Sequence, residues 1–260
     1  MIKIAGLNEQ EVNLLLPNRT ILLGYVGSIS HGTQINSQHP LSTDDKDIMG
    51  VAIGDMNVYL GLGKFEQKVV TYLEWDSVVY EIKKSFRLLL KQNPNVIGLL
   101  WLPEQNYIYR SNAGQLLILN RHLFSSKEIY HSFSGYAHGQ LHRMTHSACN
   151  GYMGEKRKKL VAQFGYDCKN AAHLIRLLRM GIEFLTDGIL QVHRKDAHEL
   201  KAIKTGKWSL EKVQDEADKL FTCARQAYVN STLPAQPQYE EAEALLIKII
   251  RQEVIQWETT

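Results

Sequence analysis

Cysteine is scarce in this sequence, and the few cysteines form no recognisable pattern. Cys149, Cys168 and Cys223 are an odd number, and no two of them make a Cys-x-x-Cys pair. Small disulfide-held domains and structural zinc sites both need closely patterned cysteines. We therefore expect reduced thiols, with neither a disulfide framework nor a structural zinc site.

Long hydrophobic runs are absent as well. No apolar stretch approaches the roughly 20 residues that a membrane-spanning helix needs, and the first residues, Met1 to Gly6, lack the hydrophobic core and cleavage site of a signal peptide. These absences predict a cytoplasmic protein with no membrane partner. The ten histidines contain no His-Glu-x-x-His spacing, so no metal site of that kind is expected.

The sequence also lacks a strong excess of one charge, because its net charge is +3 over 260 residues. That excess is too small to indicate a nucleic-acid partner, since clustering of cations matters more than their sum. The apolar content of 44% and charged content of 22% are typical of soluble globular proteins. The length suits one large domain or two small ones.

What the sequence does have is a distinctive stretch from Leu22 to Val51. An apolar run ends in Gly27-Ser28, which is typical of a strand that turns into a phosphate-binding helix start. A second apolar segment carries Asp45 and Asp47, and residues two apart on a strand point to the same face. Two adjacent carboxylates repel unless a cation lies between them, and Mg²⁺ favours carboxylates together with phosphate oxygens. The stretch therefore predicts metal-dependent nucleotidyl transfer.

This stretch resembles the nucleotidyltransferase superfamily typified by DNA polymerase β, whose signature is Gly-Ser followed by Asp-x-Asp. Within it, the sequence is most similar to the RNA-repair-pathway, or predicted nucleotidyltransferase, group of bacteria and phages. The residues that carry the resemblance are Gly27-Ser28, His31-Gly32-Thr33, Asp45-Lys46-Asp47, Gly50-Val51, Asp76, Tyr80, Lys84, Phe86, Asn93-Pro94, Gly165-Tyr166-Asp167, Lys169, His173 and Arg176-Leu177. They extend over most of the chain, from Leu22 to Pro237.

The resemblance implies an enzyme that moves a nucleoside monophosphate from a nucleoside triphosphate, ATP among the candidates, to a hydroxyl and releases pyrophosphate. It implies two Mg²⁺ or Mn²⁺ ions, bridged by Asp45 and Asp47, and an RNA acceptor such as a tRNA or a broken RNA end. Ser28 and nearby backbone N–H groups would hold phosphates, with Gly27 letting the backbone come close. Thr33 is a further nucleotide-binding candidate.

A third carboxylate is expected beside the pair, and Asp76 is the first choice by sequence order and family pattern. Glu74 has the same strand parity and is the alternative, while Glu81 is expected inside the following helix. Asp76 could equally serve as the cap of a helix that begins at Ser77. Lys46 alternates away from the metal face.

Two clusters of cations are candidates for binding phosphate. Lys169, His173 and Arg176 lie at i, i+4 and i+7 on one face of an expected helix and could contact the triphosphate. The run Lys156, Arg157, Lys158 and Lys159 could follow a nucleic-acid backbone. Either cluster could instead be an ordinary solvated face.

The order of elements predicts an α+β fold, with a small mixed sheet and flanking helices followed by an all-helical half. The expected boundaries are residues 1–110 for a catalytic domain and residues 111–260 for a helical domain. The chain breaks into expected helices and strands at Gly, Pro and polar clusters. The expected helices are Asn8–Leu16, Ser77–Gln92, Ser126–Gly151, Asp167–Leu185, Trp208–Tyr228 and Tyr239–Trp257, and the expected strands are Ile21–Val26, Asp47–Ile53 and Val69–Trp75.

Two other functions fit part of the same pattern. Nucleotidylation of a protein or small molecule uses the same Gly-Ser and Asp-x-Asp groups with a different acceptor. A non-catalytic nucleotide-binding module is the third possibility, although such a module gains little from a costly pair of carboxylates. The sequence does not identify which nucleotide is transferred, which molecule accepts it, or the oligomeric state.

Overall fold

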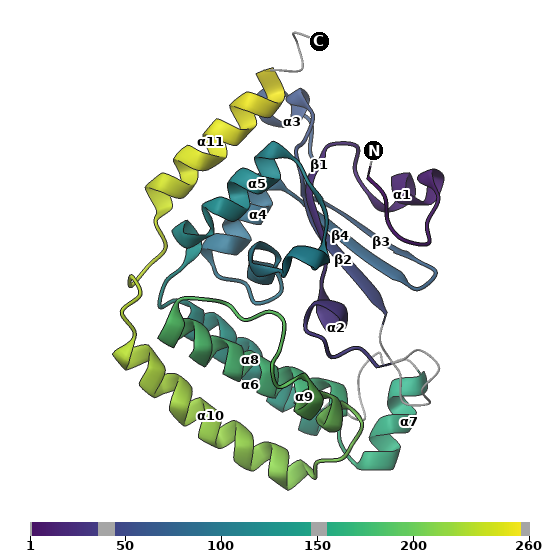
Figure 1. Cartoon of the computed structure of the whole chain (residues 1–260), viewed down its shortest axis with the longest axis vertical. Helices are drawn as coiled ribbons and strands as arrows, with labels where there is room; N and C mark the ends of the chain where they lie inside the picture. The colour runs from purple at the N-terminus through teal and green to yellow at the C-terminus, as the bar shows by residue number, and fades with distance from the viewer. Residues whose placement is uncertain (1, 36–44, 147–154, 256–260) are drawn as a thin grey trace. The chain divides into compact units, whose positions relative to one another are not determined.

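A computed structural model describes residues 2–35, 45–146 and 155–255 of the chain. The chain forms two compact units, each built from more than one segment (Figure 1). Unit 1 contains Met1–Ser30, Asp45–Ser125 and Pro237–Thr260, and unit 2 contains His31–Asp44 and Ser126–Gln236. The chain therefore passes between the units inside the Leu22 to Val51 stretch.

Unit 1 is built on a mixed sheet of five strands in the order β3-β4-β2-β1-β5. Strands β2 and β4 are parallel, and the other neighbouring pairs are antiparallel. The bounds are Thr20–Tyr25 for β1, Lys46–Ala52 for β2, Gln67–Tyr72 for β3, Trp75–Glu81 for β4 and Tyr107–Arg110 for β5. This sheet with its helices, together with an all-helical second unit, confirms the α+β fold.

Helices lie on both faces of the sheet of unit 1 (Figure 1). Helix α1 packs on one face, α4 and α5 pack on the other, and α11 packs on the outside of α4 and α5. The bounds are Glu9–Leu15 for α1, Gly27–Ser30 for α2, Met56–Leu60 for α3, Ile82–Leu90 for α4, Asn112–Leu119 for α5 and Tyr239–Ile255 for α11, with 3₁₀ turns at Ile97–Trp101, Glu104–Asn106 and Arg121–Phe124. The guanidinium of Arg19, the residue before β1, donates a hydrogen bond to the backbone carbonyl of Glu253 in α11 at 2.6 Å, which links α11 to the sheet.

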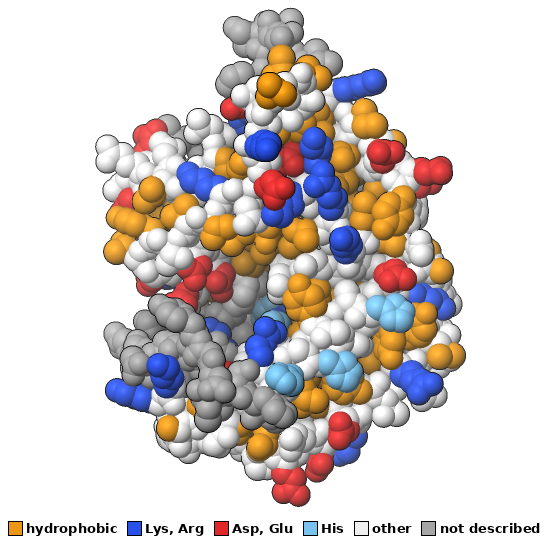
Figure 2. All heavy atoms as spheres, turned by 180° about the vertical axis from the view of Figure 1, so that it is seen from behind, with side chains coloured by type: hydrophobic (Ala, Val, Ile, Leu, Met, Phe, Trp, Pro, Cys, Tyr) orange, Lys and Arg blue, Asp and Glu red, His pale blue; other side chains and the backbone are white. Residues whose placement is uncertain are grey.

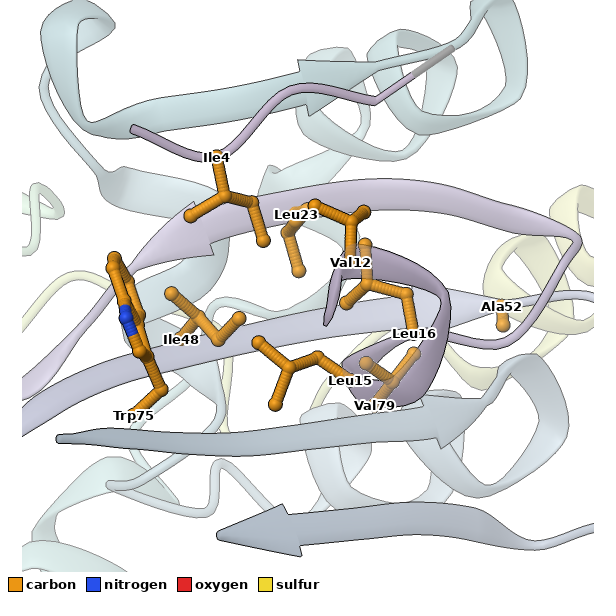
Figure 3. Packing of buried hydrophobic residues seen from close by; sticks show 9 residues of the cluster. All are labelled: Ile4, Val12, Leu15, Leu16, Leu23, Ile48, Ala52, Trp75 and Val79. Atoms are coloured by element: carbon orange, nitrogen blue, oxygen red, sulfur yellow. The ribbon is translucent and has the colours of Figure 1, made fainter. Parts of the chain in front are cut away.

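The hydrophobic cluster between α1 and the sheet shows which face each strand residue takes. Val12, Leu15 and Leu16 of α1 and the segment after it lie against Leu23, Ile48 and Val79 of three neighbouring strands (Figure 3). Removing such side chains from water is the main stabilising term of a core. Because successive strand residues alternate, the neighbours of Ile48 and Val79 in β2 and β4 point to the opposite face.

Unit 2 is a helical bundle around α8 (Cys168–Asp187). Asp167 caps this helix by accepting hydrogen bonds from the backbone N–H groups of Lys169 and Asn170 at 3.1 Å. The helix is packed on three sides by α6, α9 and α10, which explains its long apolar stripe. The other helices are α6 (Ile129–His146), α7 (Glu155–Phe164), α9 (Ala197–Lys204) and α10 (Leu210–Asn230).

The prediction of a helix from Ser77 to Gln92 is wrong over its first third. Residues Trp75–Glu81 form strand β4, and helix α4 begins only at Ile82. Burial alternates along β4, with Trp75, Ser77, Val79 and Glu81 buried. The apolar residues at Val78, Ile82 and Phe86 fit a helical spacing equally well, so the spacing of apolar residues did not distinguish a strand from a helix here.

Among the described residues, no helix has the length and hydrophobicity of a membrane span.

Candidate active site

Asp47 and Asp76 lie directly opposite one another on the parallel strands β2 and β4. Both belong to the face of the sheet opposite α1, because their strand neighbours Ile48 and Ser77 point toward α1. Each is the second residue of its strand, and both are half-buried. Directly opposed strand residues project side by side. The sheet therefore brings these two carboxylates together at the end where strands β2 and β4 begin.

Strand β4 also changes the roles expected for the nearby acids. Asp76 is a strand residue and caps no helix. Glu81, expected inside the helix, is instead its N-cap, accepting from the backbone N–H of Lys84 at 3.1 Å and from the hydroxyl of Tyr59 at 2.8 Å. Glu74, the alternative third carboxylate, lies in the turn before β4 and forms an ion pair with Lys46 at 2.5 Å.

Asp45 precedes β2, and its side chain is exposed. Lys46, between Asp45 and Asp47, points to the α1 side of the sheet, with its ammonium 5.0 Å from the centre of the Trp75 ring. The alternation expected along this segment is therefore present.

The turn after β1 lies against Asp47. The backbone N–H of Val26 donates to the carbonyl of Asp47 at 3.0 Å, which continues the pairing of β1 and β2 by one residue. Gly27 then has φ +62, a left-handed conformation that strongly favours glycine. A Cβ at Gly27 would also come within 3.0 Å of the carboxylate carbon of Asp47. Both the backbone conformation and the contact with the Asp47 carboxylate therefore favour glycine here.

Ser28 presents a polar atom that the described structure leaves unsatisfied. Its hydroxyl oxygen is buried and has no hydrogen-bond partner among the residues described. An unsatisfied buried hydroxyl costs about 1–3 kcal/mol, so the position suits a group that arrives with a ligand. Ser28 is the residue after Gly27 in the one-turn helix α2, and is thus held at the same corner as Asp47.

The described residues contain no group of three or more His, Cys, Asp or Glu side chains arranged to hold a metal ion. The pair Asp47 and Asp76 nevertheless fits Mg²⁺ in the type and number of donors. Mg²⁺ is commonly held by one or two carboxylates and completes its six positions with water and substrate phosphates. The candidate site thus contains the carboxylates of Asp47 and Asp76, Gly27, and the hydroxyl of Ser28, which has no partner among the described residues.

The other nucleotide-binding candidates belong to unit 2. Thr33 is buried, and its carbonyl accepts a hydrogen bond from the buried ammonium of Lys204 at 3.1 Å. Lys169, His173 and Arg176 lie on α8 at the expected spacing, and all three are half-buried.

Arg176 has unusual surroundings for a guanidinium. Among the described residues its hydrogen bond goes to the sulfur of Met180 at 3.3 Å, and no carboxylate there lies at ion-pair distance. Burial and then the positive charge of Arg194 lower the pKa of Arg176 to about 9. One turn further on, Arg179 is paired with three carboxylates, those of Asp196, Glu199 and Glu216. The carboxylate of Asp196 opposes the lowering of the Arg176 pKa without forming an ion pair with it, so Arg176 is a charged group with no acid at ion-pair distance among the described residues.

His31 lies in the same surroundings and was not among the predicted site residues. Its Nδ1–H donates to the carbonyl of Val192 at 2.8 Å. Burial, and next the positive charge of Arg176, lower the pKa of His31 well below 6.5. The sequence signal was its place in His31-Gly32-Thr33, but only the fold brings it beside α8.

The basic run forms the first part of α7. The side chains of Lys158 and Lys159 are exposed, whereas those of Lys156 and Arg157 fall outside the described residues.

Comparisons with known proteins identify a family for this chain. Residues 7–248 match the family described as the RNA repair pathway DNA polymerase beta family. Among solved structures, the chain is similar to a nucleotidyltransferase-like protein from Exiguobacterium sibiricum 255-15, at 13% sequence identity and a TM-score of 0.30, covering 94% of this chain and 78% of that one. No curated protein matches the chain.

Proposed function

The chain belongs to the RNA repair pathway DNA polymerase beta family, and from this premise we propose that it is a metal-dependent nucleotidyltransferase. It moves a nucleoside monophosphate from a nucleoside triphosphate to a hydroxyl of RNA, either a tRNA or a broken RNA end, and releases pyrophosphate. The observation that carries the proposal is the register of Asp47 opposite Asp76, beside the Gly27-Ser28 turn.

Asp45, Asp47 and Asp76 are the residues that would hold two Mg²⁺ or Mn²⁺ ions. Such ions neutralise the charge that develops on the transferred phosphate and lower the pKa of the attacking hydroxyl. Asp47 is central, because the sheet fixes it beside Asp76 and the turn fixes it beside Gly27. Asp45, exposed at the start of β2, completes the set.

Phosphate binding is proposed for both units. In unit 1, the hydroxyl of Ser28, which has no hydrogen-bond partner among the described residues, donates to a phosphate oxygen, and Gly27 lets the backbone approach. In unit 2, Arg176 supplies a guanidinium with no acid at ion-pair distance among the described residues, and Lys169 and His173 lie on the same helix face. Charge-assisted bonds of this kind are about twice as strong as neutral ones. Thr33 belongs to the same proposed set.

An RNA acceptor is supported by the family and by the cations of α7. Lys158 and Lys159 are exposed, and each phosphate neutralised by such a side chain releases counterions and adds to affinity at low salt. Lys156 and Arg157 complete the proposed nucleic-acid contact.

A transfer assay tests the function directly. The protein is incubated with Mg²⁺ and each of four α-labelled nucleoside triphosphates, together with total RNA, total protein extract or neither. We expect label in RNA from wild-type protein and none from Asp47→Ala, assayed in parallel at equal folded concentration. Label in protein would instead support protein nucleotidylation. No label in any mixture, with triphosphate still bound, would support a non-catalytic module.

A further inference from the structure

Two helices of unit 2 display aromatic and histidine rings together at the protein surface. The rings are those of Tyr130, His131 and His138 on α6 and Phe221 and Tyr228 on α10, and we name this set the ring stripe. His131 and His138 are exposed, and the other three are half-buried. The space-filling view shows histidine and hydrophobic side chains gathered on one face (Figure 2).

The rings form two contacting groups. The imidazole of His138 stacks on Phe221, with ring centres 4.1 Å apart and planes inclined by 13°. Tyr130 stacks on Tyr228 at 4.7 Å, and His131 meets the edge of Tyr228 at 5.4 Å. His138 has Phe221 on one side and is exposed overall, so a ring surface stays open to a flat ligand. The stripe is thus a platform that already contains stacked pairs.

The two groups lie about two helical turns apart. His131 and His138 are seven residues apart, as are Phe221 and Tyr228, which corresponds to about 10 Å along each helix. Gly135 lies midway on the exposed face of α6, and a Cβ placed there would have nothing within 4 Å. A glycine inside a helix weakens it by about 0.5–1 kcal/mol relative to alanine. Packing does not require this glycine, whereas close approach of a ligand between the rings would.

Cations flank the stripe. The ammonium of Lys127 lies 6.0 Å from the centre of the Tyr228 ring. Arg225 is exposed and shares a helix face with Phe221 and Tyr228. Arg143 is exposed as well, and its guanidinium lies 3.6 Å from the Cβ position of Gly139, next to His138. The nearest acids in sequence are Glu128 and Asp218, so the cations outnumber them.

We propose that the ring stripe binds single-stranded RNA, with bases stacked on the open ring surfaces and phosphates near Lys127, Arg143 and Arg225. The proposal rests on the proposed function, in that it gives the RNA acceptor a binding surface distinct from α7. Open rings interleaved with cations are the chemistry of single-strand binding, because every base has a face to stack and every nucleotide a phosphate. A paired duplex hides its base faces, so the stripe favours an unpaired segment.

Fluorescence anisotropy with a labelled single-stranded RNA of mixed sequence, without nucleoside triphosphate, tests the platform. His138→Ala should weaken the Kd by about 5- to 150-fold, the range that stacking contributes per base. His138→Phe keeps a stackable ring and should bind within about threefold of wild type. His198→Ala removes an exposed histidine on α9 and serves as the matched control, with no change expected.

Gly135 supplies a test that poor folding cannot mimic. Gly135→Leu improves the helix propensity of an exposed site but fills the space between the rings, so it should weaken RNA binding while the melting temperature stays equal or rises. Gly135→Ala adds only a Cβ and should weaken binding less than Gly135→Leu does. The same RNA annealed to its complement should bind less tightly than the single strand.

Wild-type affinity in both His138→Ala and Gly135→Leu would overturn the proposal, as would equal affinity for single strand and duplex, or no RNA binding at all. The transfer assay separates this failure from that of the proposed function. Transfer to RNA with an unaffected Kd in the ring-stripe variants refutes only the surface. Loss of RNA binding in those variants, in a protein that transfers to no acceptor, refutes only the reaction.

Discussion

The carboxylate of Asp47 fills the space in which a Cβ of Gly27 would have to lie. The two residues are twenty positions apart in the sequence, yet the pairing of β1 with β2 brings them into contact. Gly27 also has a left-handed φ, so its backbone conformation and its contact with Asp47 are two separable requirements.

Replacing Gly27 separates these requirements. Gly27→Ala should cost about 1–2 kcal/mol of unfolding free energy from the left-handed φ, and it should reduce transfer further by displacing the Asp47 carboxylate. Gly6→Ala is the matched control, because Gly6 has φ +85 with nothing near its Cβ position. Urea unfolding and single-turnover transfer measure the two effects. Equal loss of activity in both variants would contradict the role given to the contact.

Loss of either metal-binding aspartate should abolish transfer without unfolding the protein. We expect Asp45→Ala and Asp47→Ala each to lower kcat by about 100-fold or more, since a metal site contributes several kcal/mol to the transition state. Removing one of two neighbouring carboxylates should leave the melting temperature without Mg²⁺ unchanged or raised. Chelation of divalent ions should reproduce the loss in wild type. Normal turnover in both variants would refute the metal assignment.

The third carboxylate is tested by comparing Asp76 with Glu74. Asp76→Asn should reduce transfer strongly and keep triphosphate binding, because its proposed part lies with the acceptor hydroxyl. Glu74→Gln removes one member of an exposed ion pair with Lys46, which is worth little, and should change transfer less than threefold. Steady-state kinetics with a separate binding titration distinguish the two. The reverse ranking would move the assignment to Glu74.

Arg176 should show opposite effects on binding and stability. Arg176→Met removes a poorly solvated charge that has no acidic partner among the described residues, so we expect the melting temperature to hold or rise. Triphosphate binding should fall about tenfold or more with the loss of charge-assisted bonds. Lys169→Ala should weaken triphosphate binding too, because it removes a second cation from the same helix face.

Arg179→Met is the matched control on the same helix. It leaves three carboxylates without their cation and should lower stability, while triphosphate binding per folded molecule is kept. If Arg176→Met instead destabilises the protein and binds triphosphate normally, Arg176 has a structural role only.

Acidification should destabilise the protein partly through His31. Its pKa in the fold lies well below 6.5, so the unfolded chain takes up a proton at a higher pH than the folded protein does. The contribution is present above pH 6.5 and is lost as the pH falls from there toward the lowered pKa. His31→Gln, which keeps a donor for the carbonyl of Val192, should reduce the difference in urea midpoint between pH 7 and pH 5. An unchanged difference would contradict the neutral state of His31 in the fold.

Much of the secondary structure follows from local signals. Asn8, Asp167 and Ser209 each precede a periodic apolar run and each cap the predicted helix, because a side-chain oxygen satisfies N–H groups that the helix itself leaves open. Strand β4 was not predicted because the apolar residues of this segment fit both the two-residue period of a strand and the 3.6-residue period of a helix. Its pairing with β2 and β3 stabilises the strand. The functional division at residue 110 stays a prediction.

The sequence by itself determined the kinds of groups at the candidate site. Through residue type and spacing alone, Gly27-Ser28 predicts a phosphate-binding turn and Asp45-Lys46-Asp47 predicts a pair of metal-binding carboxylates. Only the tertiary structure decided that Asp76 lies beside Asp47, that the Asp47 carboxylate occupies the Cβ position of Gly27, and that Arg176 lies near His31. These relationships depend on strand register and helix packing. Register is fixed by long-range pairing and burial, which local sequence patterns do not contain.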